Sequence, residues 1–277
     1  MKLRCGGRVL DLACTQVMGV LNTTPDSFSD GGQFLNLDAA LKRANDMCSQ
    51  GASIIDVGGE STRPGAIKVS LQQELDRVIP VVESIARNID VCISVDSSSP
   101  QVMLAAKQAG AHMLNDVRAL QRKDAMQTAK STELPVCLMH MQGEPDTMQK
   151  NPSYTGVLDD IYVYLAKRIQ ACNQMGIAND QILVDPGFGF GKTAAHNYQL
   201  LAKLERLKTL GVPVLVGLSR KSMIGAALGD CDVSDRMIGS VAGAVIAAMN
   251  GAHIVRVHDV KETFEALEIV KATKRQQ

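Results

Sequence analysis

Acidic and amide side chains recur at the ends of short apolar runs in this sequence. Asp96, Asn115 and Asp185 each occupy such a position. Their oxygens accept hydrogen bonds, and a hydrogen bond to a charged group contributes about 1.5–3 kcal/mol. Each residue alone could simply cap a following helix, which is a common role for Asp and Asn at such junctions. Together, the three predict a floor of acceptors for a flat heterocycle with an N–C–N edge.

Basic side chains follow other apolar runs. They are Arg63, Arg220, Lys221, Arg256 and His258. Cationic side chains bind phosphate through charge-assisted hydrogen bonds. If the apolar runs are neighbouring strands, these residues form a cationic rim beside the acceptor floor, which is suited to a phosphate-bearing substrate.

The segment 184–193, with the sequence VDPGFGFGKT, matches a phosphate-binding loop only in part. Gly191, Lys192 and Thr193 fit the end of that motif, but Pro186 stands where its first glycine is required. The glycine spacing is also one residue short of the dinucleotide-binding pattern. We therefore interpret the segment as a strand end followed by a ligand-binding loop, and we expect Lys192 to be solvated or to cap the next helix.

The elements that must position these side chains repeat along the chain. Eight apolar runs are each followed by an amphipathic helical segment. The expected strands are 17–21, 53–57, 91–95, 112–114, 135–139, 182–184, 213–217 and 253–257, and the expected helices are 37–50, 71–88, 100–109, 122–130, 157–175, 196–207, 221–228 with 234–250, and 260–273. Continuously apolar strands between helices are typical of a parallel sheet buried on both faces, and eight strands close a barrel.

The sequence therefore predicts an α/β fold, the (β/α)8 TIM barrel. A doubly wound open sheet is the alternative, but it would favour a nucleotide fingerprint after its first strand. Residues 1–14 alternate around Gly6 and Gly7, which predicts an N-terminal β-hairpin capping the bottom of the barrel. Without a linker of biased composition, residues 1–277 are expected to form a single domain. In such barrels the carboxyl ends of the strands form the active site.

Composition excludes several classes of function. The 29 basic residues equal the 29 acidic residues, so we expect no nucleic-acid partner. The longest apolar stretch, 241–249, is too short to span a bilayer, and the N-terminus lacks an apolar leader, so we expect no membrane association. Seven scattered cysteines without a C-x-x-C motif indicate reduced thiols and a cytoplasmic location. The five histidines lack zinc-ligand spacing.

Several segments together resemble the dihydropteroate synthase family of the folate pathway. They are 18–22 (MGVLN), 24–32 (TPDSFSDGG), 57–65 (VGGESTRPG), 94–96 (SVD), 138–143 (LMHMQG), 185–192 (DPGFGFGK), 217–222 (GLSRKS) and 256–260 (RVHDV). The resemblance covers nearly the whole chain. Small departures from the family pattern fall at Thr23, Ser97 and 236–240, and none removes a group that the chemistry requires.

The resemblance implies a transferase reaction and a set of roles. A 6-hydroxymethyl-7,8-dihydropterin pyrophosphate would condense with para-aminobenzoate to give 7,8-dihydropteroate and pyrophosphate, with Mg²⁺ as cofactor. By resemblance, the catalytic residues are Asp96, Lys221, Arg256 and His258; the pterin-binding residues are Asp96, Asn115, Asp185, Lys221 and Arg256; the pyrophosphate-binding residues are Asn22, Arg63, Arg256 and His258, with Asn22 also near the metal; and the para-aminobenzoate pocket comprises Phe28, Thr62, Arg63, Pro64, Phe190 and Ser222. The family also implies a homodimer and sulfonamides as inhibitors.

The sequence contains no evident pair of nucleophile and base. An aromatic amine is a weak nucleophile, so we expect the protein to promote SN1-like departure of pyrophosphate instead. Three alternatives stay open at this point: a pterin-binding methyltransferase domain, an inactive pterin-binding scaffold, and a generic sugar-phosphate enzyme on the same barrel. The last leaves Asp96, Asn115 and Asp185 without a role.

Overall fold

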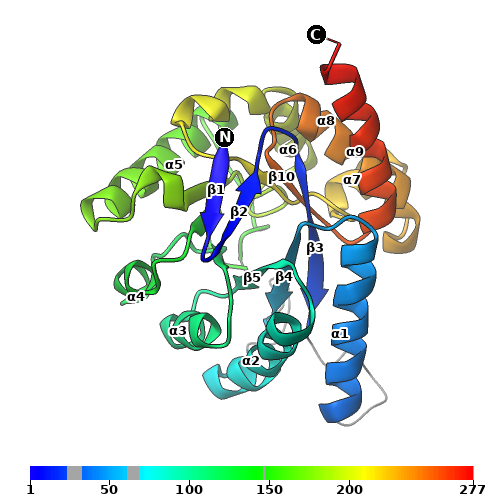
Figure 1. The fold of residues 1–277 in the computed structure, drawn as a ribbon. Coiled ribbons are helices and arrows are strands. Elements are labelled where there is room, and N and C mark those ends of the chain that lie inside the picture. The colour runs from blue at the N-terminus through cyan, green and yellow to red at the C-terminus, as the bar shows by residue number, and fades with distance from the viewer. Residues whose placement is uncertain (24–32, 61–68, 146, 277) are drawn as a thin grey trace.

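The computed structural model describes residues 1–23, 33–60, 69–145 and 147–276. Strands and helices alternate along the chain, as Figure 1 shows. The strands are β1 Lys2–Cys5, β2 Arg8–Asp11, β3 Gln16–Asn22, β4 Ile54–Gly58, β5 Cys92–Asp96, β6 Met113–Asp116, β7 Val136–Met139, β8 Ile182–Asp185, β9 Leu215–Val216 and β10 Ile254–Val257. The α-helices are α1 Gln33–Ser49, α2 Leu71–Asn88, α3 Pro100–Gln108, α4 Ala125–Thr132, α5 Val157–Gln174, α6 Ala194–Ala202, α7 Ser222–Ala227, α8 Met237–Met249 and α9 Val260–Lys274.

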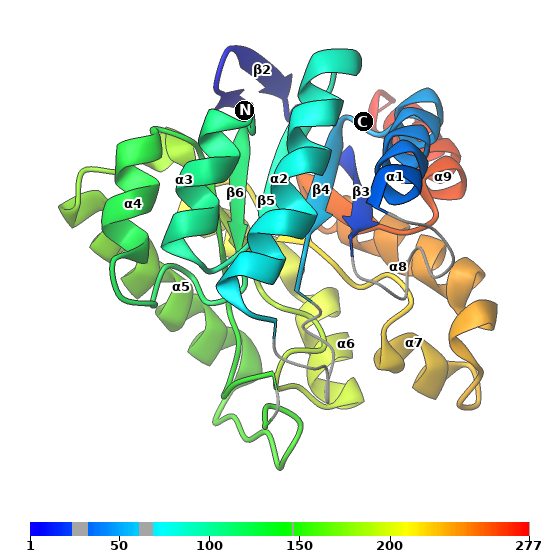
Figure 2. The ribbon, with the colours of Figure 1, turned by 90° about the horizontal axis from the view of Figure 1, so that it is seen from below.

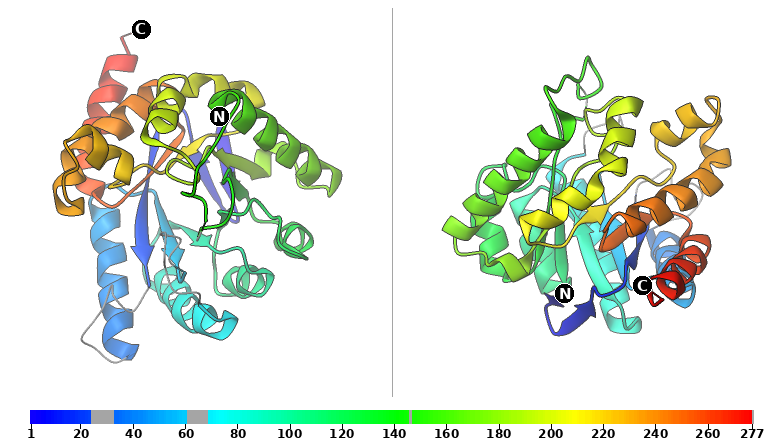
Figure 3. Two further views of the ribbon diagram at one scale, coloured as in Figure 1. Left: turned by 180° about the vertical axis from the view of Figure 1, so that it is seen from behind. Right: turned by 90° about the horizontal axis from the view of Figure 1, so that it is seen from above.

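Eight parallel strands form a barrel, in the order β8-β7-β6-β5-β4-β3-β10-β9. A parallel bridge between Val184 and Val214 brings the two ends of this order together. The helices lie outside the strands, and Figure 3 shows them from two further sides. The predicted (β/α)8 barrel is therefore confirmed. No helix in the described part of the chain is long and apolar enough to cross a bilayer.

The N-terminal hairpin closes the end of the barrel where the strands begin (Figure 2). β1 and β2 pair antiparallel, and the side chains of Leu3 and Cys5 are fully buried. They pack, with Leu12, against one apolar side chain from each barrel strand. These are Met18, Ile54, Cys92, Met113, Cys137, Leu183, Leu215 and Ile254. The expected cap on the barrel bottom is confirmed, and it seals an apolar layer from water.

The two-residue period of a strand places polar groups directly above this apolar layer. Successive side chains of a strand point to opposite faces, so every second residue enters the barrel. Two positions after Ile54, Met113, Leu183 and Ile254 come Asp56, Asn115, Asp185 and Arg256, all in strands. Along these four strands the interior therefore changes from apolar to polar within one step, toward the carboxyl ends.

Local signals account for the start of two helices, while one expected helix is divided. Ser70 and Gln73 form a capping box at the start of α2, and Thr193 and His196 form another at α6. The helix expected over 196–207 is instead α6 followed by a 3₁₀ segment, Leu204–Leu210. Lys203 leaves helical geometry between them, with φ −117° and ψ 22°.

Candidate active site

Arg256 is the centre of a charged network inside the barrel. Its Nε atom donates a hydrogen bond to Asp56 Oδ2 at 2.6 Å, and its Nη2 atom donates to Asp96 Oδ2 at 3.1 Å. Asn115 Nδ2 donates to the same Asp56 oxygen at 3.2 Å. Strands β10, β4, β5 and β6 thus each contribute one side chain. These hydrogen bonds hold the side chains of Asp96 and Asn115 in place inside the barrel.

A second group lies at the carboxyl end of β8. Asp185 Oδ1 accepts a hydrogen bond from the backbone N–H of Gly187 at 2.7 Å. Lys221, from the loop after β9, donates to the carbonyl oxygen of Phe188. Its ammonium also lies 4.4 Å from the centre of the Phe190 ring, a cation–π contact. Asp185, Lys221 and Phe190 therefore line one side of the barrel mouth.

Two glycines lie between these groups. A Cβ added at Gly58 would lie 3.5 Å from Asp96 Cβ and 3.9 Å from Asn22 Oδ1. A Cβ added at Gly217 would lie 3.7 Å from Arg256 Cβ and 4.0 Å from Asp185 Oδ2. Both glycines therefore face the same polar interior as the charged side chains. Because neither carries a side chain, a flat ring could lie against the backbone there.

Burial and neighbouring charges shift the pKa values of these groups. Burial raises the pKa of Asp96 to about 7, against the opposing effect of Arg256. Burial also raises the pKa of Asp185, while Lys221 and the Gly187 N–H lower it. Burial lowers the pKa of Lys221 to about 8. Shifts of this kind in one recess, together with the geometry, mark a candidate functional site.

Two predicted phosphate-binding residues lie at this mouth. Asn22 is half-buried at the end of β3, in register with Gly58. His258 Nδ1 lies 3.1 Å from Ser219 Oγ, which joins the loops after β10 and β9. Arg220, which was expected in the same cationic rim, lies on the loop after β9 and is paired with Asp259. Its Nε donates to Asp259 Oδ2 at 3.0 Å, and a second bond from Nη2 completes a bidentate ion pair.

The predicted pocket for para-aminobenzoate is described only in part. Phe190 is half-buried beside Lys221, and Ser222 is exposed as the first residue of α7. Phe28, Thr62, Arg63 and Pro64 lie outside the residues that the structure describes. The predicted role of Arg63 in binding pyrophosphate therefore stays a prediction.

Other polar residues at strand ends face away from the barrel interior. Asp116 Oδ1 accepts from the Arg118 N–H at 2.8 Å and Oδ2 accepts from the Leu120 N–H at 2.7 Å, so its carboxylate holds the loop after β6.

Lys192 contradicts our expectation of a solvated or capping residue, because it is only 3% exposed. Its ammonium lies inside the loop after β8, beside His140.

Asp56 is a site residue to which sequence reasoning assigned no role. It is fully buried, and Oδ1 has no hydrogen-bond partner among the described residues. Ser94, two residues before Asp96 on the neighbouring strand, is also buried with an unpartnered hydroxyl in the described chain. The two-residue period could have identified both, because Asp56 follows Ile54 and Ser94 follows Cys92 by two positions.

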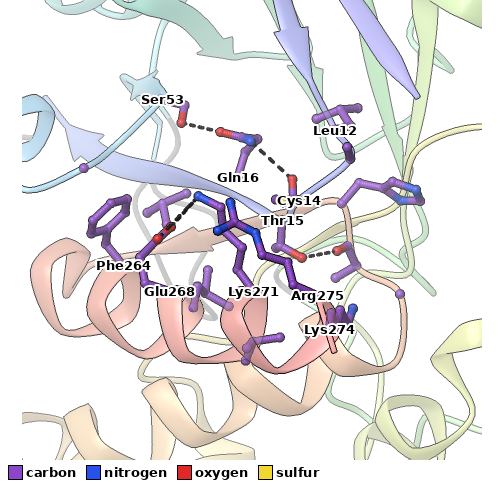
Figure 4. A pocket seen from close by; sticks show the side chains of 18 of the residues that line it. Leu12, Cys14, Thr15, Gln16, Ser53, Phe264, Glu268, Lys271, Lys274 and Arg275 are labelled. Carbon is purple, nitrogen blue, oxygen red and sulfur yellow. Dashed lines mark hydrogen bonds and ion pairs between the residues drawn. The ribbon is translucent and has the colours of Figure 1, made fainter. Parts of the chain in front are cut away.

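A hollow of about 430 Å³ lies at the opposite end of the barrel, beside the hairpin and α9 (Figure 4). Several of its polar groups already have partners. Lys271 pairs with Glu268 at 3.0 Å, Lys274 Nζ donates to the carbonyl of Ala248 at 2.8 Å, and Thr15 donates to that of Ala252 at 2.8 Å. This hollow is therefore separate from the candidate active site.

Sequence comparison connects this geometry to known proteins. A family model described as pterin binding enzyme matches residues 18–258. Dihydropteroate synthase of Escherichia coli (strain K12) is 56% identical over 273 residues, which cover 99% of this chain and 96% of that protein. Dihydropteroate synthase of Haemophilus influenzae is 54% identical over 273 residues and is covered to 99%, as is this chain.

Solved structures match over the same length. The Yersinia pestis dihydropteroate synthase with a sulfonamide drug complex superimposes with a TM-score of 0.95 and 56% identity, covering 99% of this chain and 100% of that one. The Xanthomonas albilineans dihydropteroate synthase with 4-aminobenzoic acid gives a TM-score of 0.93 and 46% identity, covering 99% and 98%. Fold and sequence therefore point to the same family.

Proposed function

The chain belongs to the dihydropteroate synthase family of pterin binding enzymes, and from this premise we propose how its residues carry out the reaction. It is a transferase of folate biosynthesis. The reaction condenses 6-hydroxymethyl-7,8-dihydropterin pyrophosphate with para-aminobenzoate and releases 7,8-dihydropteroate and pyrophosphate. The residue roles, the metal, the oligomeric state and the location that follow are proposals.

The acceptor floor of the barrel binds the pterin ring. Asp185, Asn115 and Asp96 would accept hydrogen bonds from the N–H groups along the ring edge, and Lys221 and Arg256 would contact the ring. The observation that carries this proposal is the Asp56–Arg256–Asp96 network at the carboxyl ends of the strands, next to Gly58 and Gly217, which carry no side chain. A buried acceptor is costly when unpaired, so the recess favours a ligand rich in donors.

The pyrophosphate lies at the outer rim of the same recess. We assign it to Asn22, Arg63, Arg256 and His258. Arg256 supports this because its guanidinium is already oriented by Asp56 and Asp96, and side chains held in advance lose less entropy on binding. His258 and Ser219 lie on the loops after β10 and β9, where barrels commonly bind phosphate.

At this rim, most ligands of Mg²⁺ would be substrate oxygens and few would be protein atoms. The described residues contain no group of three His, Cys, Asp or Glu side chains arranged to hold a metal ion. Mg²⁺ often takes only one or two protein ligands together with phosphate oxygens. The amide oxygen of Asn22 lies beside Gly58 at the mouth and is a suitable hard ligand. When bound there, Mg²⁺ would neutralise negative charge on the pyrophosphate.

We assign an SN1-like path to the reaction. The bond between the pterin methylene carbon and the pyrophosphate oxygen breaks first, and the electron pair leaves with pyrophosphate, whose charge Arg256 and His258 stabilise. Asp96 and Asp185 stabilise the positive charge that spreads over the ring. The lone pair of the amine then forms the C–N bond, and one amine proton leaves to solvent.

A single-turnover experiment tests this path. The enzyme is mixed with the pterin pyrophosphate and Mg²⁺ without para-aminobenzoate, and pyrophosphate is quantified. We expect pyrophosphate to form at a rate comparable with that of the complete reaction. If none forms until the amine is added, the attack and the departure are concerted and the SN1-like path is wrong.

The second substrate would lie outside the pterin, near Phe190 and Ser222. The remaining proposed members of this pocket are Phe28, which follows β3 in the sequence, and Thr62, Arg63 and Pro64, which follow β4 in the sequence. The Yersinia pestis and Xanthomonas albilineans structures contain a sulfonamide drug and 4-aminobenzoic acid. We therefore propose para-aminobenzoate as the ligand of this pocket and sulfonamides as its competitors.

Exposed apolar side chains on α8 and in the segment before it support a homodimer. Ile238 is 77% exposed and Met249 is 59% exposed. Leu228, Val233 and Ile246 are also exposed large apolar side chains in this region. Contiguous apolar surfaces of this kind mark protein interfaces. We propose that a second copy of this chain covers them, and light scattering on an Ile238→Glu variant tests whether the dimer dissociates.

Two further properties follow from the composition of the interior. All seven cysteines are free thiols, which favours a reducing cytoplasmic location. The hairpin shares one apolar layer with all eight barrel strands, which favours a single domain over residues 1–277. The partners we propose are thus the two small-molecule substrates and a second copy of the chain, with no nucleic acid and no membrane.

The alternatives are separated by one assay. Incubation with the pterin pyrophosphate, para-aminobenzoate and Mg²⁺ is monitored for pyrophosphate and 7,8-dihydropteroate. A synthase forms both in equal amounts. A methyltransferase domain or an inactive scaffold would bind the pterin in calorimetry but form neither product.

A further inference from the structure

Lys192 is a buried lysine that the reaction outlined above does not use. Its ammonium donates hydrogen bonds to the carbonyl oxygens of Gly187 at 2.8 Å and Phe190 at 3.0 Å. It also lies 3.0 Å from His140 Nδ1, at the carboxyl end of the neighbouring strand β7. A lysine is almost never fully buried without such partners. Lys192 therefore connects the first and last residues of the turn 187–190 to the adjacent strand.

The number of acceptors matches the charged form of the side chain. An ammonium has three N–H donors and no acceptor, and three acceptors surround this one within 3.0 Å. His140 must then present an unprotonated Nδ1. Burial and the nearby Lys192 lower the pKa of His140 to about 3, so its ring is neutral at pH 7. Burial lowers the pKa of Lys192 to about 7, and the Asp185 carboxylate opposes that change.

The whole glycine-rich loop presents its carbonyl groups to side-chain donors. Gly187 and Phe190 bond to Lys192, Phe188 bonds to Lys221, Gly189 to Gln149, and Gly191 to Tyr154. A phosphate-binding loop does the opposite, since it converges backbone N–H groups on an anion. The loop after β8 is thus built around the buried side chain of Lys192.

The turn that Lys192 holds is attached to the groups at the barrel mouth. The Gly187 peptide supplies the N–H that orients Asp185 Oδ1 at 2.7 Å. One residue later, the Phe188 carbonyl receives the Lys221 ammonium. Phe190 then places its ring 4.4 Å from the same ammonium. A shift of this turn would therefore move an acceptor for the pterin, its cationic partner and one wall of the second pocket together.

We propose that Lys192 is a positioning residue, whose buried hydrogen bonds to Gly187, Phe190 and His140 set the loop 187–191. The loop in turn orients Asp185, Lys221 and Phe190 for both substrates. This inference rests on the proposed roles of those three residues. Lys192 touches neither substrate in this arrangement, because its ammonium is enclosed by protein acceptors.

The test replaces Lys192 by methionine, which keeps the length of the stem and removes the charge. We expect the Kd of the pterin in calorimetry and the KM of para-aminobenzoate each to rise about tenfold or more, because misplacing groups by a fraction of an ångström weakens binding at both subsites. Gln149→Ala is the matched control, since it removes a donor to the same loop from an exposed side chain. Its Kd and KM should stay within twofold of the wild type.

Three outcomes would overturn the proposal. One is a Lys192→Met enzyme whose Kd and KM stay within twofold of the wild type. A second is a lowered melting temperature with both constants unchanged, which would make Lys192 purely structural. The third is an equal effect of Gln149→Ala. Because the wild type is assayed in parallel, its failure to form 7,8-dihydropteroate would count against the proposed function and not against Lys192.

A second variant decides the matter if Lys192→Met does not fold. His140→Phe removes one acceptor from Lys192 but retains a ring for the edge-to-face contact with Tyr164, whose centre lies 4.9 Å away. We expect a rise of Kd and KM in the same direction and of smaller size. A folded His140→Phe enzyme with wild-type constants would overturn the proposal.

Discussion

Arg256 and Asp56 form the inner ion pair of the barrel, with 2.6 Å between Nε and Oδ2. Asp56 has no exposed surface, and the same arginine reaches Asp96 with its second nitrogen. Burial alone would lower the pKa of Arg256, but Asp56 and Asp96 raise it. The pair therefore fixes the cation that we place against both the pterin and the pyrophosphate, and the first prediction concerns Asp56.

Asp56→Asn should lower kcat/KM by about 100-fold, which corresponds to about 2.7 kcal/mol of lost transition-state stabilisation. The amide keeps the shape of the side chain but removes the charge that orients Arg256. Steady-state kinetics with both substrates measure the effect. Ser94→Ala is the control, because Ser94 is buried on the next strand and has no hydrogen-bond partner in the described chain. Equal kinetics of both variants would show that Asp56 only fills space.

Asp185→Asn should weaken pterin binding by about 3 kcal/mol, or roughly 150-fold in Kd. The carboxylate can accept hydrogen bonds from two N–H groups of the ligand. The amide of Asn can accept from only one of them, and its NH₂ group would face the other, which is left unpaired. Isothermal calorimetry with the unphosphorylated pterin measures the loss. An unchanged Kd would remove Asp185 from the ring site.

The pKa of Asp96 predicts a pH dependence. Burial raises this pKa from 3.8 to about 7, so the folded protein holds a proton that the unfolded chain releases. The contribution of Asp96 to the free energy of unfolding is fully present below pH 3.8, and it is lost as pH rises through about 7. Denaturant unfolding between pH 5.5 and 8.5 should therefore show the wild type losing stability relative to Asp96→Asn. If the free energy of unfolding changes with pH in the same way for both proteins, the raised pKa of Asp96 is contradicted.

Deprotonation of Asp96 should also raise the affinity for the pterin. If Asp96 accepts a hydrogen bond from the pterin, the charged carboxylate is the form that binds, and affinity should rise with pH through about 7. Calorimetry with the unphosphorylated pterin avoids titration of the pyrophosphate. In Asp96→Asn this rise should disappear, and a rise that persists would come from another group.

Gly217→Ala tests the space assigned to the ring. The added methyl group would lie 3.7 Å from Arg256 Cβ, an ordinary contact, so we expect the melting temperature to change little. The methyl group would also project toward Asp185 and narrow the recess, so the KM for the pterin substrate should rise by about tenfold, or 1.4 kcal/mol. Gly7→Ala in the hairpin, where no heavy atom lies within 4 Å, is the control. A wild-type KM in Gly217→Ala would place the ring elsewhere.

Arg63→Ala tests a residue outside the described part of the chain. We expect pterin affinity to stay unchanged, because the acceptor floor is intact, while turnover falls by about 10²-fold or more through the loss of a cation near the leaving group. Calorimetry and steady-state rates separate these two effects. If only the melting temperature changes, Arg63 has a structural role.

Periodicity along the chain was enough to predict the barrel. Eight apolar runs with intervening helices allow few arrangements that bury both faces of the strands. The helix expected over 71–88 has the same bounds in the structure, because Ser70 and Gln73 provide a local start signal. The positions of Asp96, Asn115 and Asp185 at strand ends were evident for the same reason. Such features depend on neighbours in the chain, which the sequence displays directly.

Tertiary structure decided which polar residues act together. Lys192 was expected to be solvated or to cap a helix, yet its partner His140 lies 52 positions away at the end of another strand. Arg220 was expected in the cationic rim, and its ion pair with Asp259 from the following β/α unit became evident only in the structure. Asp56 had no assigned role until Arg256, 200 positions distant, was found beside it. The charge and burial of a side chain depend on groups that only the closed barrel brings together, because the members of the site come from different strands.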